Sequence, residues 1–264
     1  MGTMQPRAIE LKGQTAAGPR YPVICAPLVA RTRADLLTEV FAVAAKHPDI
    51  MEWRVDFFDA IADTAEVVEL VGRIKELSGG IPLMFTRRSD REGGQRIGLT
   101  EGQVIGLYRA VCQTGLVDLV DFEMENHPTD ILEVREMTQA RDIQLVLSHH
   151  DFESTPSHAD LMKRFGQGDM NDADIIKIAV MPQSMEDVLT LFAATLEASR
   201  TLEVPVVSMA MGRLGAVSRL CGWAFGSAMT FAVGESSSAP GQMPIEDVGI
   251  AIGILQKALS WRDL

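Results

Sequence analysis

The chain has 264 residues, of which 47% are hydrophobic and 23% are charged, and its 24 basic against 36 acidic side chains give a net charge of −12. This composition is typical of a globular protein that buries a sizeable core. The acidic balance argues against nucleic acids and anionic membrane surfaces as partners, but not against an anionic small molecule held in a pocket.

Cysteine usage and hydropathy further restrict the class of protein to which the chain can belong. The three cysteines are far apart and form no C-x-x-C pair, so neither a disulfide framework nor a cysteine zinc site is indicated. The N-terminus has no apolar signal core, and no apolar run approaches the ~20 residues of a membrane span. We therefore expect a cytoplasmic protein.

Short apolar runs alternate with longer amphipathic stretches in chain order. We expect strands at residues 22–29, 50–55, 81–86, 117–123, 143–148, 175–180, 205–211 and 226–233. We expect helices at residues 33–47, 64–78, 101–115, 129–141, 156–166, 184–200, 214–224 and 245–260. Capping boxes are predicted where Thr100 precedes Gln103 and where Asp63 precedes Glu66.

This alternation predicts the α/β class and a (β/α)8 barrel. Residues 1–264 are expected to form one domain, because no low-complexity linker interrupts the units. Residues 1–20 are expected to form an N-terminal cap with a short strand or hairpin near residues 8–11. A doubly wound open sheet is the alternative, but its glycine-rich turn after the first strand is missing at residues 27–31.

Lys177 stands in the middle of an apolar, β-branched strand. Burial disfavours the charged form of a lysine, and a neutral amine can attack a carbonyl to form a Schiff base. A lysine that extends to solvent or pairs with a carboxylate is an equally good interpretation of this strand alone.

Alternation of side chains between the two faces of a strand sorts the other polar residues. Leu145 and Leu147 suit a face packed on helices, which places His149 on that face and His150 in the mouth of the barrel. Further polar groups lie near the carboxyl ends of other strands, where such barrels carry their catalytic residues: Glu52, Arg54, Asp56, Arg88, Asp121, Glu123 and Arg219.

Several motifs also have simpler interpretations. Adjacent His149 and His150 look like metal ligands, but neighbouring strand residues point in opposite directions, so we expect no metal. Residues 234–242 are a mobile loop or a lid over the mouth. Met209 and Met211 fit barrel filling.

These segments together resemble type I 3-dehydroquinate dehydratases, enzymes of the shikimate pathway. The matching motifs run in the family's order from about residue 21 to 255. They are EWRVD (52–56), FTRRS (85–89) with EGG (92–94), SHHDF (148–152), KIAVMPQ (177–183), GAVSR (215–219) and SAPGQ (238–242).

The resemblance implies a lyase that dehydrates 3-dehydroquinate to 3-dehydroshikimate without a metal or organic cofactor. Lys177 would form the Schiff base with the C3 ketone, and His150 would be the general acid and base of a syn elimination. An iminium withdraws electrons more strongly than a ketone, which makes the neighbouring C–H acidic enough for an imidazole. Glu92 would orient that imidazole.

The resemblance also implies a substrate site and an assembly. Arg219 would bind the substrate carboxylate with two hydrogen bonds, and Ser238 and Gln242 would close over the substrate. The remaining predicted substrate-binding residues are Glu52, Arg54, Arg88, Met209 and Phe231. The family implies a homodimer, with no nucleic acid and no membrane as partners.

Three positions depart from the family pattern. His149 stands where asparagine is frequent, Arg87 where an aromatic residue is common, and Gln95 where an acid is common. Two other functions remain as alternatives. A class I Schiff-base aldolase would need a phosphate site after the late strands, and a non-enzymatic, metabolite-binding barrel would not need the lysine and histidine together.

Overall fold

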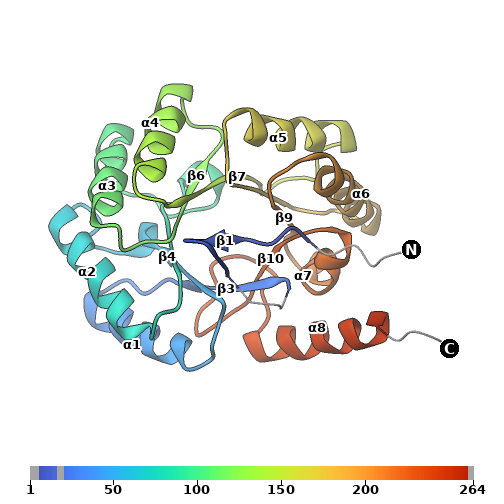
Figure 1. Cartoon of the computed structure of the whole chain (residues 1–264), viewed down its shortest axis with the longest axis horizontal. Helices are drawn as coiled ribbons and strands as arrows, with labels where there is room; N and C mark the ends of the chain where they lie inside the picture. Colours follow the sequence, from blue (N-terminus) through green and yellow to red (C-terminus); the bar gives the residue numbers. More distant parts are fainter. Residues whose placement is uncertain (1–5, 17–20, 261–264) are drawn as a thin grey trace.

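The computed structural model describes residues 6–16 and 21–260. Parallel strands form the centre of the molecule and helices surround them (Figure 1). The strands of this sheet are β3 (Val23–Leu28), β4 (Ile50–Arg54), β5 (Leu83–Thr86), β6 (Leu119–Glu123), β7 (Gln144–Asp151), β8 (Ile175–Val180), β9 (Val206–Ala210) and β10 (Met229–Phe231).

Each strand is followed by a helix that covers the outside of the sheet. The helices are α1 (Arg33–Ala44), α2 (Thr64–Leu77), α3 (Glu101–Thr114), α4 (Pro128–Gln139), α5 (His158–Met170), α6 (Met185–Thr201), α7 (Ala216–Cys221) and α8 (Ile245–Ser260). Thr100 and Gln103 make the predicted capping box. At Asp63 the side chain accepts from the backbone N–H of Glu66, but the reciprocal bond of a box is not formed.

The sheet closes on itself. Its strand order is β10-β3-β4-β5-β6-β7-β8-β9, every neighbouring pair is parallel, and a bridge between Val206 and Ser227 joins the two ends. The predicted (β/α)8 barrel is therefore confirmed. Among the described residues, no helix is long and apolar enough to cross a membrane.

Element boundaries differ from the prediction in two places that bear on the site. Strand β7 continues to Asp151, beyond the predicted end at Ser148, so His150 lies on a regular strand. The helix predicted at 214–224 is shorter and gives way to the 3-10 turn η3 (Gly222–Phe225), which ends at Gly226 with a left-handed φ of 102°. Glycine adopts this conformation without steric cost, and the chain can therefore turn sharply into β10.

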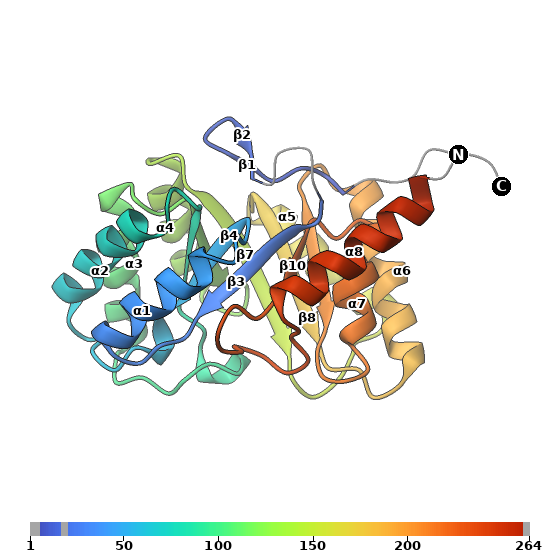
Figure 2. The same cartoon turned by 90° about the horizontal axis from the view of Figure 1, so that it is seen from below.

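A short hairpin covers the end of the barrel where the strands begin (Figure 2). It consists of β1 (Glu10–Leu11) and β2 (Gln14–Thr15), paired antiparallel. Its Ile9 and Leu11 are buried in the barrel's inner core, and Lys12 forms an ion pair of 3.1 Å with Asp118. Residues 1–5 and 17–20 of the predicted cap lie outside the described residues.

Two apolar cores result from the alternation of side chains along the strands. Leu145 and Leu147 belong to the outer core between strands and helices, whereas Val146 belongs to the inner core. The inner core fills the half of the barrel at the amino ends of the strands, with residues such as Ile50, Met84, Leu119 and Ile175. Polar side chains on the same inward faces stand above this apolar floor, and they form the site.

Candidate active site

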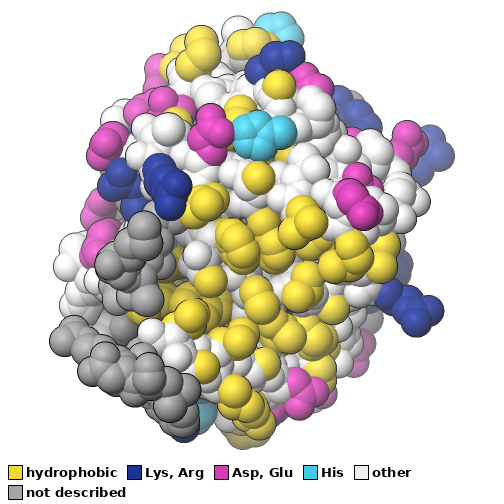
Figure 3. Space-filling view, turned by 90° about the vertical axis from the view of Figure 1, so that its right-hand side faces the viewer, with side chains coloured by type: hydrophobic (Ala, Val, Ile, Leu, Met, Phe, Trp, Pro, Cys, Tyr) yellow, Lys and Arg dark blue, Asp and Glu magenta, His cyan; other side chains and the backbone are white. Residues whose placement is uncertain are grey.

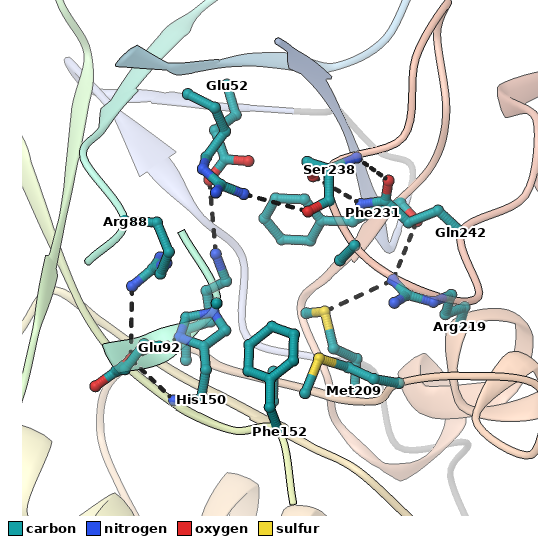
Figure 4. Close-up of a pocket in the computed structure, with 16 residues that line it drawn as sticks. Glu52, Arg88, Glu92, His150, Phe152, Met209, Arg219, Phe231, Ser238 and Gln242 are labelled. Atoms are coloured by element: carbon teal, nitrogen blue, oxygen red, sulfur yellow. Dashed lines mark hydrogen bonds and ion pairs between the residues drawn. The ribbon is translucent and has the colours of Figure 1, made fainter. Parts of the chain in front are cut away.

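A cavity opens at the carboxyl ends of the strands (Figure 4). All of the predicted site residues line it, although they come from many different strands and loops. They are Glu52, Arg54, Arg88, Glu92, His150, Lys177, Met209, Arg219, Phe231, Ser238 and Gln242. Phe152, Ala179 and Met211 complete much of the wall, so an apolar side faces a charged one.

Lys177 lies on the floor of this cavity, with only 4% of its surface exposed. Its Nζ donates to Asp121 Oδ2 at 2.9 Å and lies 3.7 Å from Glu52 Oε1, and it stands 4.3 Å from the centre of the Phe231 ring. The sequence of the strand around Lys177 therefore did not reveal these two carboxylates. Two carboxylates from other strands compensate the ammonium charge and fix the position of the nitrogen.

His150 reaches the same cavity from β7, which is the strand paired with β8. Its Nδ1 lies 2.9 Å from Glu92 Oε2, and its backbone N–H donates to the same oxygen at 3.0 Å. Burial, together with the positive charges of Arg88 and Lys177, lowers the pKa of His150 well below its ordinary value. The ring is therefore a neutral base near pH 7, and Nε2 is the ring nitrogen left for a substrate.

Glu92 comes from the short 3-10 turn η2 (Asp90–Glu92) after β5. Burial and the neighbouring Glu123 carboxylate raise the pKa of Glu92 to about 8. The carboxyl group and the imidazole therefore titrate together. Near neutral pH the proton resides mainly on Glu92, and His150 is neutral.

Arg88 joins the carboxylates behind the cavity into one network. Its guanidinium donates to Asp121 Oδ1 at 2.7 Å, to Ser148 Oγ at 2.8 Å and to Glu123 Oε1 at 3.2 Å. Ser148 Oγ in turn donates to Asp121 at 2.6 Å. Burial alone would raise the pKa of Asp121, but the charges of Arg88 and Lys177 hold it well below its usual range. Asp121 is therefore a fixed anion beside the lysine.

Arg219, on α7, is buried to 1% exposure on the opposite wall. Its Nη2 donates to the Pro240 carbonyl at 3.1 Å, and Nη1 makes longer contacts with the Phe231 carbonyl at 3.5 Å and Met209 Sδ at 3.7 Å. Within the described residues, Nε has no partner and no carboxylate pairs with this cation. Burial lowers the pKa of Arg219 to about 10, so it remains charged and well placed for an anion that enters from outside.

Residues 234–242 fold over the mouth between β10 and α8. Gln242 Oε1 accepts from the Ser238 backbone N–H at 3.0 Å, and Gln242 Nε2 donates to Ser238 Oγ at 3.2 Å. Arg54, held by a two-point ion pair with Asp56 at 2.8 Å for each contact, reaches the Ser238 carbonyl at 3.4 Å. The loop thus brings two of the predicted binding side chains against the cavity.

Comparison with known proteins identifies the family. The model of the family described as type I 3-dehydroquinase matches residues 24–258. The chain belongs to the type I 3-dehydroquinase family.

Relatives named 3-dehydroquinate dehydratase match nearly the whole chain. One from Albidiferax ferrireducens is 51% identical, covering 96% of both chains, and one from Aromatoleum aromaticum is 48% identical, covering 96% of this chain and 97% of the relative. The crystal structure of 3-dehydroquinate dehydratase from Geobacillus kaustophilus has a TM-score of 0.92 at 47% identity, with 96% and 98% of the two chains covered. The type I enzyme from Clostridium difficile, solved with covalently modified comenic acid, has a TM-score of 0.90 at 35% identity, covering 96% and 99%.

Some contributors to this type I 3-dehydroquinase site were not predicted. Asp121 and Glu123 were placed near the carboxyl end of their strand without a role, and Ser148 and Phe152 were not assigned to the site at all. A signal for Asp121 existed, because it shares the inward parity of Lys177 and stands near the same end of its strand. Phe152 packs on Gly93, where an added Cβ would lie 2.3 Å from its ring, so the glycine is needed for this contact.

The three departures from the family pattern have separate locations. His149 points away from the mouth, as parity predicts, and lines a different cavity outside the barrel. Arg87 forms an ion pair of 2.9 Å with Glu101 at the start of α3. Gln95 donates its backbone N–H to Asp56 Oδ2 at 3.0 Å, which helps to hold the loop after β5.

Proposed function

We infer that this protein dehydrates 3-dehydroquinate to 3-dehydroshikimate through an imine on Lys177. The observation that carries this inference is the convergence, in one cavity, of a buried lysine, a neutral imidazole on the adjacent strand and a buried arginine that has no carboxylate partner among the described residues. Family membership supplies the substrate and the reaction.

The first step requires a neutral amine. Asp121 is a poor acceptor for the ammonium proton because its pKa is far below the usual range, so its role is to position Nζ. His150, neutral in the free protein, is the base that can take this proton. The amine then attacks the C3 ketone. His150 returns the proton to the carbinolamine hydroxyl, which leaves as water and gives an iminium ion with His150 neutral again.

The elimination follows from the electron demand of the iminium. His150 removes the proton from C2, which gives an enamine, and then protonates the C1 hydroxyl as it leaves as water. Arg219 holds the substrate carboxylate, Gln242 and Ser238 cover the ring, and Glu52, Arg54 and Arg88 contribute polar contacts. Met209 and Phe231 provide the apolar wall. Hydrolysis of the product imine restores Lys177.

Borohydride trapping tests this route. The protein is incubated with 3-dehydroquinate and borohydride, and peptide mass spectrometry is used to locate a reduced adduct, which we expect on Lys177. Lys177→Ala should lose turnover and the adduct while keeping the fold. Lys163→Ala is the matched control, because Lys163 is exposed on α5 and pairs with nearby Asp160. Full turnover by Lys177→Ala would exclude the covalent route.

We also propose that the protein forms a homodimer through an apolar face. Figure 3 shows hydrophobic side chains gathered on the side of the molecule toward α6, α7 and α8. The exposed large hydrophobic residues of this region, here called the apolar face, are Met185, Leu189, Leu214, Val217, Ile250 and Ile254. Contiguous exposed apolar surface of this kind is typical of a protein interface. The cytoplasmic location expected from the sequence stays a prediction.

A further inference from the structure

Two buried polar atoms, one on Glu92 and one on His149, face each other behind the cavity. Among the described residues, neither Glu92 Oε1 nor His149 Nδ1 has a hydrogen bond, and the two atoms are 4.0 Å apart. An unpaired buried polar atom costs about 1–3 kcal/mol. Two such atoms at this distance need only a shift of about 1 Å, or one bridging water, to form a hydrogen bond.

The contacts of the other Glu92 oxygen indicate which atom carries the proton. Oε2 accepts from the backbone N–H of His150 and lies 2.9 Å from His150 Nδ1. In the tautomer that leaves Nε2 free as the base, Nδ1 carries the ring proton, and Oε2 then accepts from both donors. Since the pKa of Glu92 is raised to about 8, the acid form is well populated near neutral pH. Its proton then belongs on Oε1, which points toward His149 Nδ1.

His149 connects this position to the outside of the barrel. It lines an open cavity between β7 and α5, together with Asp151, Asp160, Lys163, Arg164 and Gln167. Burial and the charge of Arg164 lower the pKa of His149, so the ring is neutral and Nδ1 can accept. The acidic groups that act on the ring are Glu92, Glu123, Glu125 and Asp151, with Glu125 Oε1 at 3.8 Å from Nδ1.

We propose that His149 relays protons between Glu92 and solvent in this outer cavity, and so sets the protonation of the Glu92–His150 pair while substrate and the 234–242 loop close the mouth. This inference rests on the proposed dehydration. His149 acts through Glu92 and touches no reacting atom, so it is a positioning residue and not a catalytic one.

The proton transfers balance at each step. When His150 Nε2 takes the C2 proton, the Glu92 Oε1–H bond breaks, an Nδ1–H bond forms on His149, and the Nε2 proton of His149 passes to water in the outer cavity. The resulting Glu92 carboxylate stabilises the His150 imidazolium. When His150 protonates the leaving hydroxyl, the same bonds form and break in reverse, and Glu92 recovers its proton from the outer side.

Chemical rescue tests the relay. In the full-length protein, His149→Ala removes the ring and leaves its space next to the open outer cavity. We expect kcat to fall about a hundredfold, at the lower end of the range for a lost proton-transfer group, while KM changes little. Added imidazole should restore kcat in a saturable way. His158→Ala is the matched control, because His158 is exposed on α5 and pairs with Glu197; its kcat should match the wild type and not respond to imidazole.

A second variant separates the relay from a structural role. His149→Gln offers Glu92 a hydrogen-bond acceptor but cannot carry the proton through, so kcat should fall as in His149→Ala at an unchanged melting temperature, without rescue. A wild-type kcat in His149→Gln, or a loss in His149→Ala that imidazole does not restore, overturns the relay. Both variants should still give the borohydride adduct on Lys177. If the wild type itself gives neither turnover nor adduct, the proposed function fails, independently of His149.

Discussion

At the scale of single residues, the site is organised by how each charge is compensated. Lys177 and Arg88 share Asp121 as a fixed anion, while Arg219 has only neutral partners among the described residues. A buried cation without a counterion is costly, and the cost is removed when an anion binds. In the free protein the charge of Arg219 is therefore uncompensated, which favours the binding of a carboxylate. The charge of Lys177 is compensated by Asp121, which holds its nitrogen in place for covalent chemistry.

Glu92 gives a pH prediction for stability. Its pKa in the folded protein is about 8, above the ordinary value of 4.5, so the fold favours the protonated carboxyl group. This stabilisation is fully present below pH ~4.5 and is lost as the pH rises through ~8. Glu92→Gln mimics the protonated form at every pH. Relative to the wild type, it should become progressively more stable between pH 5 and pH 9, by about 1.4 kcal/mol per unit of pKa shift at most.

Urea unfolding of both proteins at pH 5, 7 and 9 measures this difference. Glu153→Gln serves as the control, because Glu153 is exposed in the loop after β7. A difference between Glu92→Gln and the wild type that stays constant over this range would show that the folded protein does not favour the protonated carboxyl.

At the scale of elements, the sequence predicted the barrel well because each strand carries its own signal. An apolar run bounded by turn residues locates a strand, and the alternation along it separates His149 from His150 without any knowledge of neighbours. The ion pairs of Lys177 were not predictable in this way. Asp121 is 56 residues away in the chain and is brought to Nζ only by the tilt and register of the closed sheet.

The loop at 234–242 is a second feature that local patterns predict incompletely. Its composition indicates a loop, but its conformation depends on contacts at both ends. The backbone of Val233 pairs with Met243 and Ile245, and Lys46 Nζ donates to the Gly234 carbonyl. Near its end, Gly241 has a left-handed φ of 79° and packs directly on Gly212. These contacts hold Ser238 and Gln242 over the cavity.

Gly241→Ala should therefore disturb the loop. A Cβ at this position would lie 2.3 Å from the Gly212 carbonyl oxygen, and the left-handed backbone adds about 1 kcal/mol of strain. We expect the loop to move away from the mouth and KM to rise about tenfold, the equivalent of ~1.4 kcal/mol of lost binding. Steady-state kinetics measures this change in KM.

Gly106→Ala in α3 is the control. An added Cβ meets nothing within 4 Å there, so the variant should be slightly more stable with an unchanged KM. An unaltered KM in Gly241→Ala would mean that the loop does not contribute to binding.

At the scale of the whole molecule, the barrel separates two kinds of surface. The predicted catalytic side chains converge at the carboxyl ends of the strands, while the exposed hydrophobic residues of the apolar face lie at the side, on α6, α7, α8 and the turn before α7. The predicted site residues all line one cavity within a single barrel. We therefore expect assembly through the apolar face to add stability without supplying a group to the chemistry.

This separation makes the homodimer testable apart from activity. Ile254→Glu places a charge on the apolar face, where Ile254 is 62% exposed on α8. Burying an unpaired carboxylate in an interface costs several kcal/mol, so we expect the dimer dissociation constant to rise by about two orders of magnitude or more.

Sedimentation velocity over a concentration series measures this dissociation constant. Leu132→Glu, at a similarly exposed position on α4, should leave it unchanged. The kcat of Ile254→Glu should stay close to that of the wild type, because the predicted site residues all line one cavity within a single barrel. A wild-type protein that sediments as a monomer at micromolar concentration, or an Ile254→Glu protein that dimerises as tightly as the wild type, would contradict the proposed interface.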